Sequence, residues 1–265
     1  MDFAAAWKSL QTTLPFFSHF RPEIVWEYRQ LFLEGAVMTL KITIIAVFFG
    51  TLIGLVGGMA RLADARHGPW RLVLRWLVRL PATAYVTFFR GTPLFVQIML
   101  VHFALMPMLV HPSDGLLITG DLARSLRQDY GAFMSGLVAL TLNAGAYITE
   151  IFRAGIQSIH RGQTEASRSL GMNYWQTMRH VIIPQAFRRM LPPLGNEAIM
   201  LLKDSSLVSA IGLAEMAYAA RTVAGAYSRY WEPYLVISFS YLAMTMLMAA
   251  AIDRLERRYQ AAGGV

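Results

Sequence analysis

Residues 163–184 read QTEASRSLGMNYWQTMRHVIIP and form a polar, basic interruption in a chain that is otherwise largely apolar. The stretch predicts a short helix, a break and a second helix. Thr164 is the expected N-cap of the first helix, and Glu165 in its first turn suits the positive end of the helix dipole. Gly171 is placed to end it, because glycine adopts a positive φ at little cost. A helix this short is marginal alone in water, so we expect another element to pack on it.

The second half of this stretch predicts a helix that begins after Asn173. The Asn173 side chain can cap the helix, and Gln176 three residues later completes a capping-box pattern. Pro184 cannot continue that helix, but it can start another one. On chemistry alone, the stretch is equally compatible with an ordinary amphipathic loop at the membrane surface between two membrane helices.

The composition of the chain favours a membrane protein. Of its 265 residues 55% are hydrophobic, and the mean hydropathy is +0.42, which is too apolar for a soluble domain of this length. A net charge of +8 could indicate nucleic-acid binding in a soluble protein. Here the arginines cluster between apolar runs, so loops facing the cytoplasm explain the charge better, and no nucleic-acid partner is expected.

Five apolar stretches approach the roughly 20 residues that a helix needs to cross a bilayer. They predict an all-α integral membrane bundle of about five transmembrane helices, in contact with lipid, at 42–60, 91–110, 130–149, 191–213 and 233–252. The first span carries four glycines that give it a small-residue face for close helix packing: Gly50, Gly54, Gly57 and Gly58. Residues 1–34 are expected to form an extracytoplasmic or membrane-surface segment.

The basic residues predict the orientation of the chain in the membrane. Fifteen arginines lie in 61–90, 150–190 and the C-terminal tail, whereas seven lysines or arginines lie in the segments expected on the other side. Cytoplasmic loops carry the excess of Lys and Arg. We therefore expect the N-terminus outside and the C-terminus in the cytoplasm, together with the stretch 163–184.

The spacing within 163–184 has a close counterpart in a known family. Glu165-Ala166-Ser167, three residues, Gly171, nine residues and then Val181-Ile182-Ile183-Pro184 resembles the cytoplasmic loop of permease subunits of bacterial ABC importers. It departs from that pattern at Ser167, Val181 and Ile183. The resemblance implies a short coupling helix that docks on an ATPase, with ATPase-coupling roles for five residues: Glu165, Ala166, Ser167, Gly171 and Pro184.

Polar residues within the expected spans are candidate functional residues, because such groups are costly in a membrane unless they face a cavity or partners. Asn143, Tyr147 and Glu150 lie on one helical face of the third span. Glu150 has a local alternative, an ion pair with Arg153. In the fourth span Lys203 and Asp204 are adjacent, and the alternative for Lys203 is a structural pair with a carboxylate of a neighbouring helix.

Four further stretches resemble the polar amino acid permeases of ABC importers: RGTPLFVQ (90–97), AYITEIFRAGIQSI (146–159), NEAIMLLKDSSLVSAIG (196–212) and YWEPYLV (230–236). On chemistry alone, RGTPLFVQ is also explained as a helix-entry signal. The resemblance covers about 35–260, which we take as a type I ABC importer transmembrane domain, with 261–265 as a tail. It implies substrate-binding positions at Tyr147, Glu150, Asp204 and Ser205, and at Gln97.

That resemblance also implies the partners. They are a second permease subunit, identical or homologous, a dimer of ATPase subunits that holds ATP and Mg, and an extracytoplasmic binding protein that delivers a polar amino acid at the bacterial inner membrane. The chain itself has no G-x-x-x-x-G-K-[ST] loop, HExxH pattern or G-x-S-x-G motif. We therefore expect no cofactor, no metal and no enzymatic activity in this chain.

Two other classes of function remain as alternatives. An ion-gradient-driven secondary amino acid transporter would use Glu150, Lys203 and Asp204 as an ion relay, but it would not explain the loop spacing, and no inverted repeat is evident. A membrane anchor without transport would not need an aligned polar face in the third span.

Overall fold

The computed structural model describes residues 20–63 and 70–261, and this part of the chain is helical with no strand. The α-helices are α2 Pro22–Glu27, α3 Arg29–Leu62, α4 Trp70–Val73, α5 Leu80–Gly91, α6 Leu94–Leu100, α7 Met106–Leu109, α8 Gly120–Gln157, α9 Arg161–Ser169, α10 Tyr174–Thr177, α11 Ile183–Asp204, α12 Met216–Tyr227 and α13 Trp231–Ala261. Three π-helical turns, η2 Leu74–Arg79, η3 Val101–Leu105 and η4 Met178–Ile182, and the 3₁₀ helix η5 Ser205–Ile211 connect some of them.

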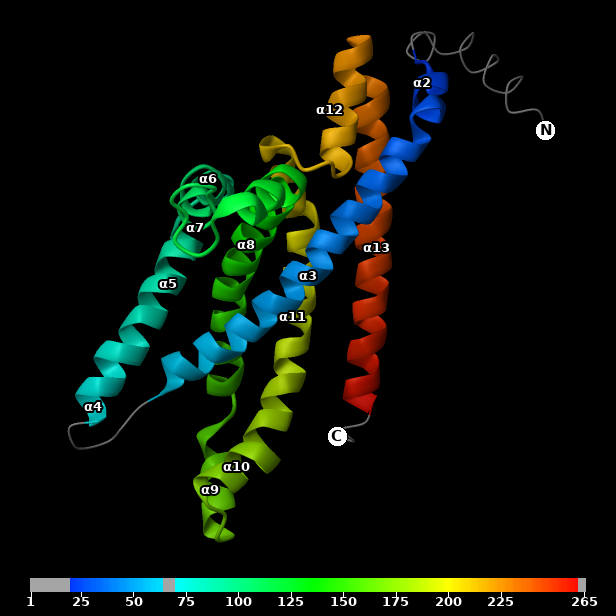
Figure 1. Ribbon diagram of the computed structural model, residues 1–265. Coiled ribbons are helices and arrows are strands. Elements are labelled where there is room, and N and C mark those ends of the chain that lie inside the picture. Colours follow the sequence, from blue (N-terminus) through cyan, green and yellow to red (C-terminus); the bar gives the residue numbers. More distant parts are fainter. Residues whose placement is uncertain (1–19, 64–69, 262–265) are drawn as a thin grey trace.

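The body of the molecule consists of the helices α3, α8, α11 and α13 together with α5 and the turn η2 before it (Figure 1). The helices α3, α8 and α13 run from the end that carries α2 and α12 toward the opposite end, and α5 and α11 run back. The α9–α10 segment forms a tip at that opposite end, and the C-terminal end of α13 points the same way. The all-α bundle predicted from the apolar stretches is confirmed.

Length and composition separate these segments into three kinds. Within the described residues, α3, α8 and α13 are each long and apolar enough to cross a membrane. Leu74–Gly91 and Leu94–Leu109 meet the same criterion of length and composition only when they are taken together, and the two segments are bent by 111° relative to each other. The fourth expected span, α11, does not pass this test, because it carries charges at both ends and in its middle: Arg188, Arg189, Glu197, Lys203 and Asp204.

The second span differs from its prediction at 91–110. The chain breaks at Thr92 and Pro93, which are extended at ψ 149° and 134°. The long limb of the pair comes before this break, in η2 and α5, and 94–109 folds back beside the upper part of α8 (Figure 1). Arg90, counted above as a loop residue, therefore lies at the end of a bundle helix.

Each π-helical turn comes directly before a proline in the first turn of the next helix. Pro81 follows η2, Pro107 follows η3 and Pro184 follows η4. A proline has no N–H, and its ring collides with the carbonyl four residues earlier, so a widened turn accommodates it. Pro184 starts α11 as predicted, but the chain stays helical from α10 through η4 instead of breaking there.

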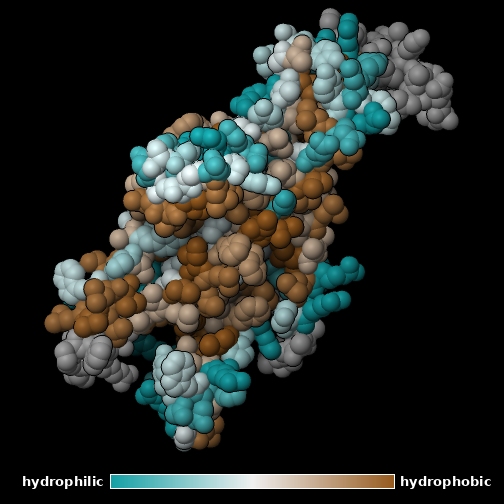
Figure 2. All heavy atoms as spheres, in the orientation of Figure 1, coloured by the Kyte–Doolittle hydropathy of each residue, from teal (hydrophilic) through white to brown (hydrophobic). Residues whose placement is uncertain are grey.

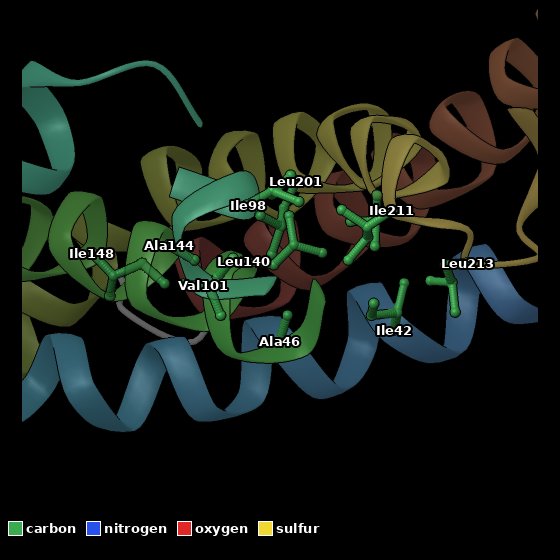
Figure 3. Close-up of a cluster of buried hydrophobic side chains, with 12 residues drawn as sticks. Ile42, Ala46, Ile98, Val101, Leu140, Ala144, Ile148, Leu201, Ile211 and Leu213 are labelled. Atoms are coloured by element: carbon green, nitrogen blue, oxygen red, sulfur yellow. The ribbon is translucent and has the colours of Figure 1, made fainter. Parts of the chain in front are cut away.

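Apolar side chains fill the centre of the bundle and also cover its outside. Ile42 of α3, Ile98 of α6, Leu140 of α8 and Leu201 of α11 belong to one buried cluster (Figure 3). Hydrophobic residues also form a broad surface band between two hydrophilic ends (Figure 2). α13 illustrates this, since only 6% of its most apolar window is buried within the chain. Such a surface suits lipid or a second membrane subunit.

The four glycines of the first expected span, at positions 50, 54, 57 and 58 of α3, form the close-packing face that was predicted, and its partner is α8. A Cβ added at Gly54 would lie 2.4 Å from Cγ2 of Ile148, and one at Gly57 would lie 2.3 Å from Oγ1 of Thr149. Gly50 and Gly58 face Ala144 and Phe152 in the same way. The two helices therefore pack with their backbones close together along this face.

We expect Gly54→Ala to destabilise the bundle, because the new methyl group must push α3 away from Ile148. Overpacking of this kind costs about 1–3 kcal/mol, and a lower thermal unfolding temperature of the purified protein should report it. The matched control is Gly131→Ala on α8, where an added Cβ meets nothing within 4 Å. Equal unfolding temperatures for the two variants would show that the glycine face does not hold α3 against α8.

A second cluster joins the N-terminal part of the described chain to α12 and α13. Ile24 and Phe32 pack there with Met216, Val223 and Ile237. The buried carboxylate of Glu215 ties the same elements together: it caps α12 by accepting from the Tyr218 N–H (2.9 Å), and it accepts hydrogen bonds from Thr39 (3.3 Å) and Tyr241 (2.7 Å). Residues 20–34 are thus largely helical and packed on the bundle, although the domain boundary at 35 stays a prediction.

Candidate functional site

Two regions of the molecule concentrate the residues singled out by the sequence. One is the α9–α10 tip, and the other is a cavity where α5, α8 and α11 meet. The tip lies at the far end of the molecule from α2 and α12 (Figure 1). The cavity lies between the long helices, next to the polar face of α8.

The turn between α9 and α10 has the predicted conformation at both of its key residues. Gly171 has φ +79°, and the N–H groups of Gly171 and Met172 donate to the carbonyls of Arg168 (2.9 Å) and Ser167 (3.1 Å). This is a Schellman motif, which satisfies the last carbonyls of α9. Asn173 caps α10 in a complete capping box with Gln176. The predicted break and second cap are confirmed.

The predicted start of the first short helix is wrong. α9 begins at Arg161, and its N-cap is His160, whose Nδ1 accepts from the Gly162 N–H at 3.1 Å. Thr164 therefore lies inside the helix, one turn beyond its start. The sequence signal that was missed is the His160 side chain. Its ring nitrogen is a less usual N-cap acceptor than a hydroxyl or a carboxylate.

The structure divides the five proposed coupling residues into two groups. Glu165, Ala166, Gly171 and Pro184 are exposed, whereas Ser167 is buried and donates to the Gln163 carbonyl at 2.6 Å. Sequence reasoning missed the apolar surface beside them: Leu170 is 83% exposed and Trp175 is 79% exposed. Large apolar side chains at an otherwise hydrophilic end of the molecule indicate a contact surface for another protein.

The tip is attached to the long helices by its own small core. Ile159, Ile182, Ala186 and Met190 form a buried cluster between the end of α8, η4 and α11. A Cβ on Gly155 would lie 2.2 Å from Cγ of Met190, so α8 and α11 are in close contact there. This packing joins the tip to both α8 and α11.

The cavity has a volume of about 530 Å³. Its lining combines apolar residues of α8 with three charged side chains, and it includes Arg90 of α5, Tyr147 and Glu150 of α8, Ser158, and Arg189 and Pro193 of α11. The Arg90 guanidinium lies over the Tyr147 ring, 5.2 Å from its centroid. Two sequence-predicted residues, Tyr147 and Glu150, are therefore brought together with two arginines.

Glu150 is surrounded by arginines from three helices. Arg153 approaches its Oε2 at 2.7 Å, Arg61 at the end of α3 pairs with its Oε1, and Arg90 lies 3.9 Å from Oε2. The local pair with Arg153 that was left open as an alternative is thus present. Sequence reasoning missed Arg61, because a pairing between residues so far apart in the chain leaves no local signal.

Gln97 lies at the bend of the α5–α6 pair and not in the cavity lining. It is 2% exposed. Its Nε2 donates to the Phe89 carbonyl (2.8 Å) and to the Thr92 carbonyl (3.0 Å), and its Oε1 accepts from Asn143 Nδ2 at 2.9 Å. The two side chains thereby form a hydrogen bond with each other, and Gln97 also bonds backbone carbonyls at the break. Both residues therefore have a structural role in the bend.

The charged residues of α11 have few partners. Asp204 is half-buried, and Ser205 is buried with its hydroxyl donating to the Leu202 carbonyl at 2.7 Å. Among the described residues no ion pair involves Lys203, which is exposed. Glu197, which lies within the expected fourth span at 191–213, is buried in the bundle.

Comparison with known proteins gives one family and several relatives. The sequence pattern of the family described as "Binding-protein-dependent transport system inner membrane component" matches residues 50–261. The glutamine transport system permease protein GlnP of Escherichia coli is 37% identical over 234 residues, which cover 88% of this chain and 95% of that protein. The arginine transport system permease protein ArtQ of Bacillus subtilis is 32% identical, covering 85% of this chain and 91% of that protein.

Solved structures resemble this one over nearly its whole length. The crystal structure of an amino acid ABC transporter with histidines superposes with a TM-score of 0.74 at 37% identity, over 90% of this chain and 99% of that one. An inward-facing structure of the MetNI methionine ABC transporter superposes with a TM-score of 0.67 at 20% identity, over 91% of this chain and 99% of that one, which indicates a shared fold.

Proposed function

The chain belongs to the family of binding-protein-dependent transport system inner membrane components, and from this membership we propose that it forms half of the path by which an ABC importer carries a polar amino acid into the cell. It is a multi-pass permease component of the inner membrane and not an enzyme. The family favours this ATP-driven importer over the ion-gradient-driven secondary transporter.

The observation that carries the proposal is the α9–α10 tip. Its exposed Leu170 and Trp175 suit docking on a separate ATPase subunit, and its core with Met190 links that contact to α8 and α11. In this proposal ATP and Mg are bound by the ATPase dimer and not by this chain. Closure of the two ATPases would then move the helices that line the cavity.

The names of the relatives support the substrate class. GlnP is a glutamine permease protein and ArtQ an arginine permease protein, so we take a polar amino acid as the substrate here and glutamine as the first candidate. The cavity between α5, α8 and α11 has the size and polarity for such a molecule. An extracytoplasmic binding protein would deliver it, and a second permease subunit would complete the path.

The function is tested by uptake into proteoliposomes that contain the permease and its ATPase. We expect labelled glutamine to enter only when ATP is inside the vesicle, on the same side as the ATPase, and the binding protein is outside. Uptake driven by a proton or sodium gradient without ATP would contradict the proposal and favour a secondary transporter.

We expect the N-terminus outside and the C-terminus in the cytoplasm, because the excess of arginine then lies inside. This orientation also places the α9–α10 tip where an ATPase can reach it. A C-terminal fusion to alkaline phosphatase should be inactive, and a C-terminal fusion to a reporter that fluoresces only in the cytoplasm should be bright. The reverse pair of signals would mean that the orientation is wrong.

A further inference from the structure

The outward face of α13 carries a continuous apolar stripe that ends in arginines. α13 lies at one flank of the bundle (Figure 1), where it packs on α11, α12 and α2. Ile237 and Ile252 are among the side chains that face these neighbours. By helical spacing, one group of exposed residues lies on the opposite face. This outward stripe consists of Phe239, Ala243, Met246, Leu247, Ala250, Arg254, Arg257 and Arg258.

The three arginines at the end of the outward stripe are free to bind a ligand. In the part of the chain that the structure describes, no ion pair or side-chain hydrogen bond involves Arg254, Arg257 or Arg258. The acidic residues of the same turns, Asp253 and Glu256, fall by their spacing on the flank between the outward stripe and α11. Each guanidinium therefore keeps its five N–H donors for an anion.

The apolar part of the outward stripe has the shape and length for a lipid chain. Ala243 and Ala250 lie along its middle, and the longer side chains of Met246 and Leu247 stand on either side, which leaves a shallow track. Ala243 precedes Arg254 by eleven positions, about 16 Å along a helix. One leaflet contributes about 15 Å of hydrocarbon, so the track spans a leaflet and the arginines lie at the height of its headgroups.

We propose that the outward stripe of α13 binds an anionic phospholipid such as phosphatidylglycerol. The arginines hold the phosphate, since a guanidinium binds a phosphate through two parallel hydrogen bonds. An acyl chain lies along the track at 243–250. With the C-terminus in the cytoplasm, this lipid belongs to the cytoplasmic leaflet, where anionic lipids attract basic residues beside a membrane helix. The inference adds a ligand that the proposed function does not use.

A second copy of the chain fits the outward stripe poorly. Two copies in one membrane share their orientation and are related by a two-fold axis along the membrane normal. Contact through this face of α13 would therefore bring the three arginines of one copy to the same height as those of the other. These groups repel one another, and the stripe holds no carboxylate to offset the repulsion. A soluble anion would use the arginines but would leave the apolar track without a role.

The test places a fluorescent label beside the outward stripe and asks which lipid reaches it. The chain has no cysteine, so Ala251→Cys gives one labelling site. Ala251 is exposed and lies at the edge of the stripe, next to Leu247 by spacing. The label is attached before the ATPase is added. The complex is then reconstituted in phosphatidylcholine vesicles that contain a small fraction of brominated lipid, whose bromine atoms quench the label at short range.

Brominated phosphatidylglycerol should quench the label more strongly than the same fraction of brominated phosphatidylcholine. One arginine near a membrane surface strengthens the binding of anionic lipid about 5-fold. Three of them should give an apparent binding constant for phosphatidylglycerol at least roughly 10-fold above that for phosphatidylcholine. The preference is a ratio, so it does not depend on the yield of the complex.

Removal of two arginines should abolish most of this preference. The double variant Arg254→Gln with Arg257→Gln should bring the two lipids to within about 5-fold of each other. The matched control is Arg161→Gln with Arg168→Gln, which removes two exposed arginines of α9 at the same end of the molecule and should keep the full preference. If the double variant cannot be reconstituted, each single variant takes its place and should lower the preference several-fold.

Four outcomes would overturn the inference. Equal quenching by the two lipids in the complex with all arginines present would show no selective site. A preference that survives loss of Arg254 and Arg257 would assign it to other residues. Loss of the preference in excess inorganic phosphate at constant ionic strength would identify a soluble anion as the ligand. A label that neither lipid quenches would show that another protein covers this face. None of these measurements involves transport, so each leaves the proposed function standing.

Discussion

Gly171→Val should leave the permease inserted in the membrane and abolish amino acid uptake. Gly171 holds φ at +79°, and an added Cβ would meet nothing within 4 Å, so the cost is one of backbone conformation and not of space. A β-branched residue resists this region, at a cost on the order of 1–3 kcal/mol. Relief of that strain would change the angle between α9 and α10 and move Leu170 and Trp175 away from their docking positions.

Three measurements on this variant separate docking from folding. Membrane insertion and yield should be close to wild type, co-purification of the ATPase should be weakened, and ATP-dependent uptake should fall to background. Gly171→Asn is the matched control, because asparagine tolerates a positive φ far better than valine, and it should keep most of the uptake. Normal uptake by Gly171→Val would remove the α9–α10 turn from the coupling mechanism.

Features set by neighbouring residues were predictable from the sequence. The Gly171 turn and the Asn173 cap each depend on a few consecutive residues, and both form as expected. The start of α9 was misplaced, because His160 was not considered as a cap and Thr164 has the side chain more usual there. The glycine face of α3 was also predictable, but its partner α8 was not. The spacing of the glycines indicates that α3 packs closely on another helix, but it does not identify that helix.

The second span was predicted at the wrong residues because hydropathy was the only criterion used to locate it. The stretch 91–110 is more apolar than 74–90, which carries arginines, yet the break at Thr92 and Pro93 makes 94–109 fold back. Arginine side chains near the ends of a span can reach the headgroups, so such a helix still fits a membrane. The same misplacement assigned Arg90 to a loop, when it belongs to the cavity.

The site residues divide by how far their partners lie along the chain. The Glu150–Arg153 pair is three residues apart and was anticipated, whereas Arg61 comes from another helix and was not. The resemblance implied a substrate contact for Gln97, whereas in the structure its Oε1 accepts from Asn143, which lies far along the chain, and it forms part of the bend. Glu197 was not singled out, because a single charge within 191–213 does not stand out until its burial is known.

Glu150→Gln should lower the amount and the thermal stability of the assembled complex without changing the selectivity of what remains. Glu150 is the carboxylate on which Arg61, Arg153 and Arg90 converge, and its side chain is 16% exposed. Removing the charge leaves three guanidinium groups close together with nothing to offset their repulsion. Loss of one partner from a largely buried pair costs on the order of 3 kcal/mol, whereas Asp121→Asn, which breaks an exposed pair with Arg124, should have little effect on stability.

A double-mutant cycle makes this prediction specific to the arginine cluster. Arg61→Gln combined with Glu150→Gln should destabilise less than the sum of the two single changes, because the second change removes one of the repelling charges. Complexes of the Glu150→Gln variant that survive purification should transport cationic and neutral amino acids in the wild-type ratio. If the variant assembled fully but lost transport of cationic substrates selectively, Glu150 would be a substrate-binding residue after all. Its contact with Arg61 would then not have the stabilising role that the geometry indicates.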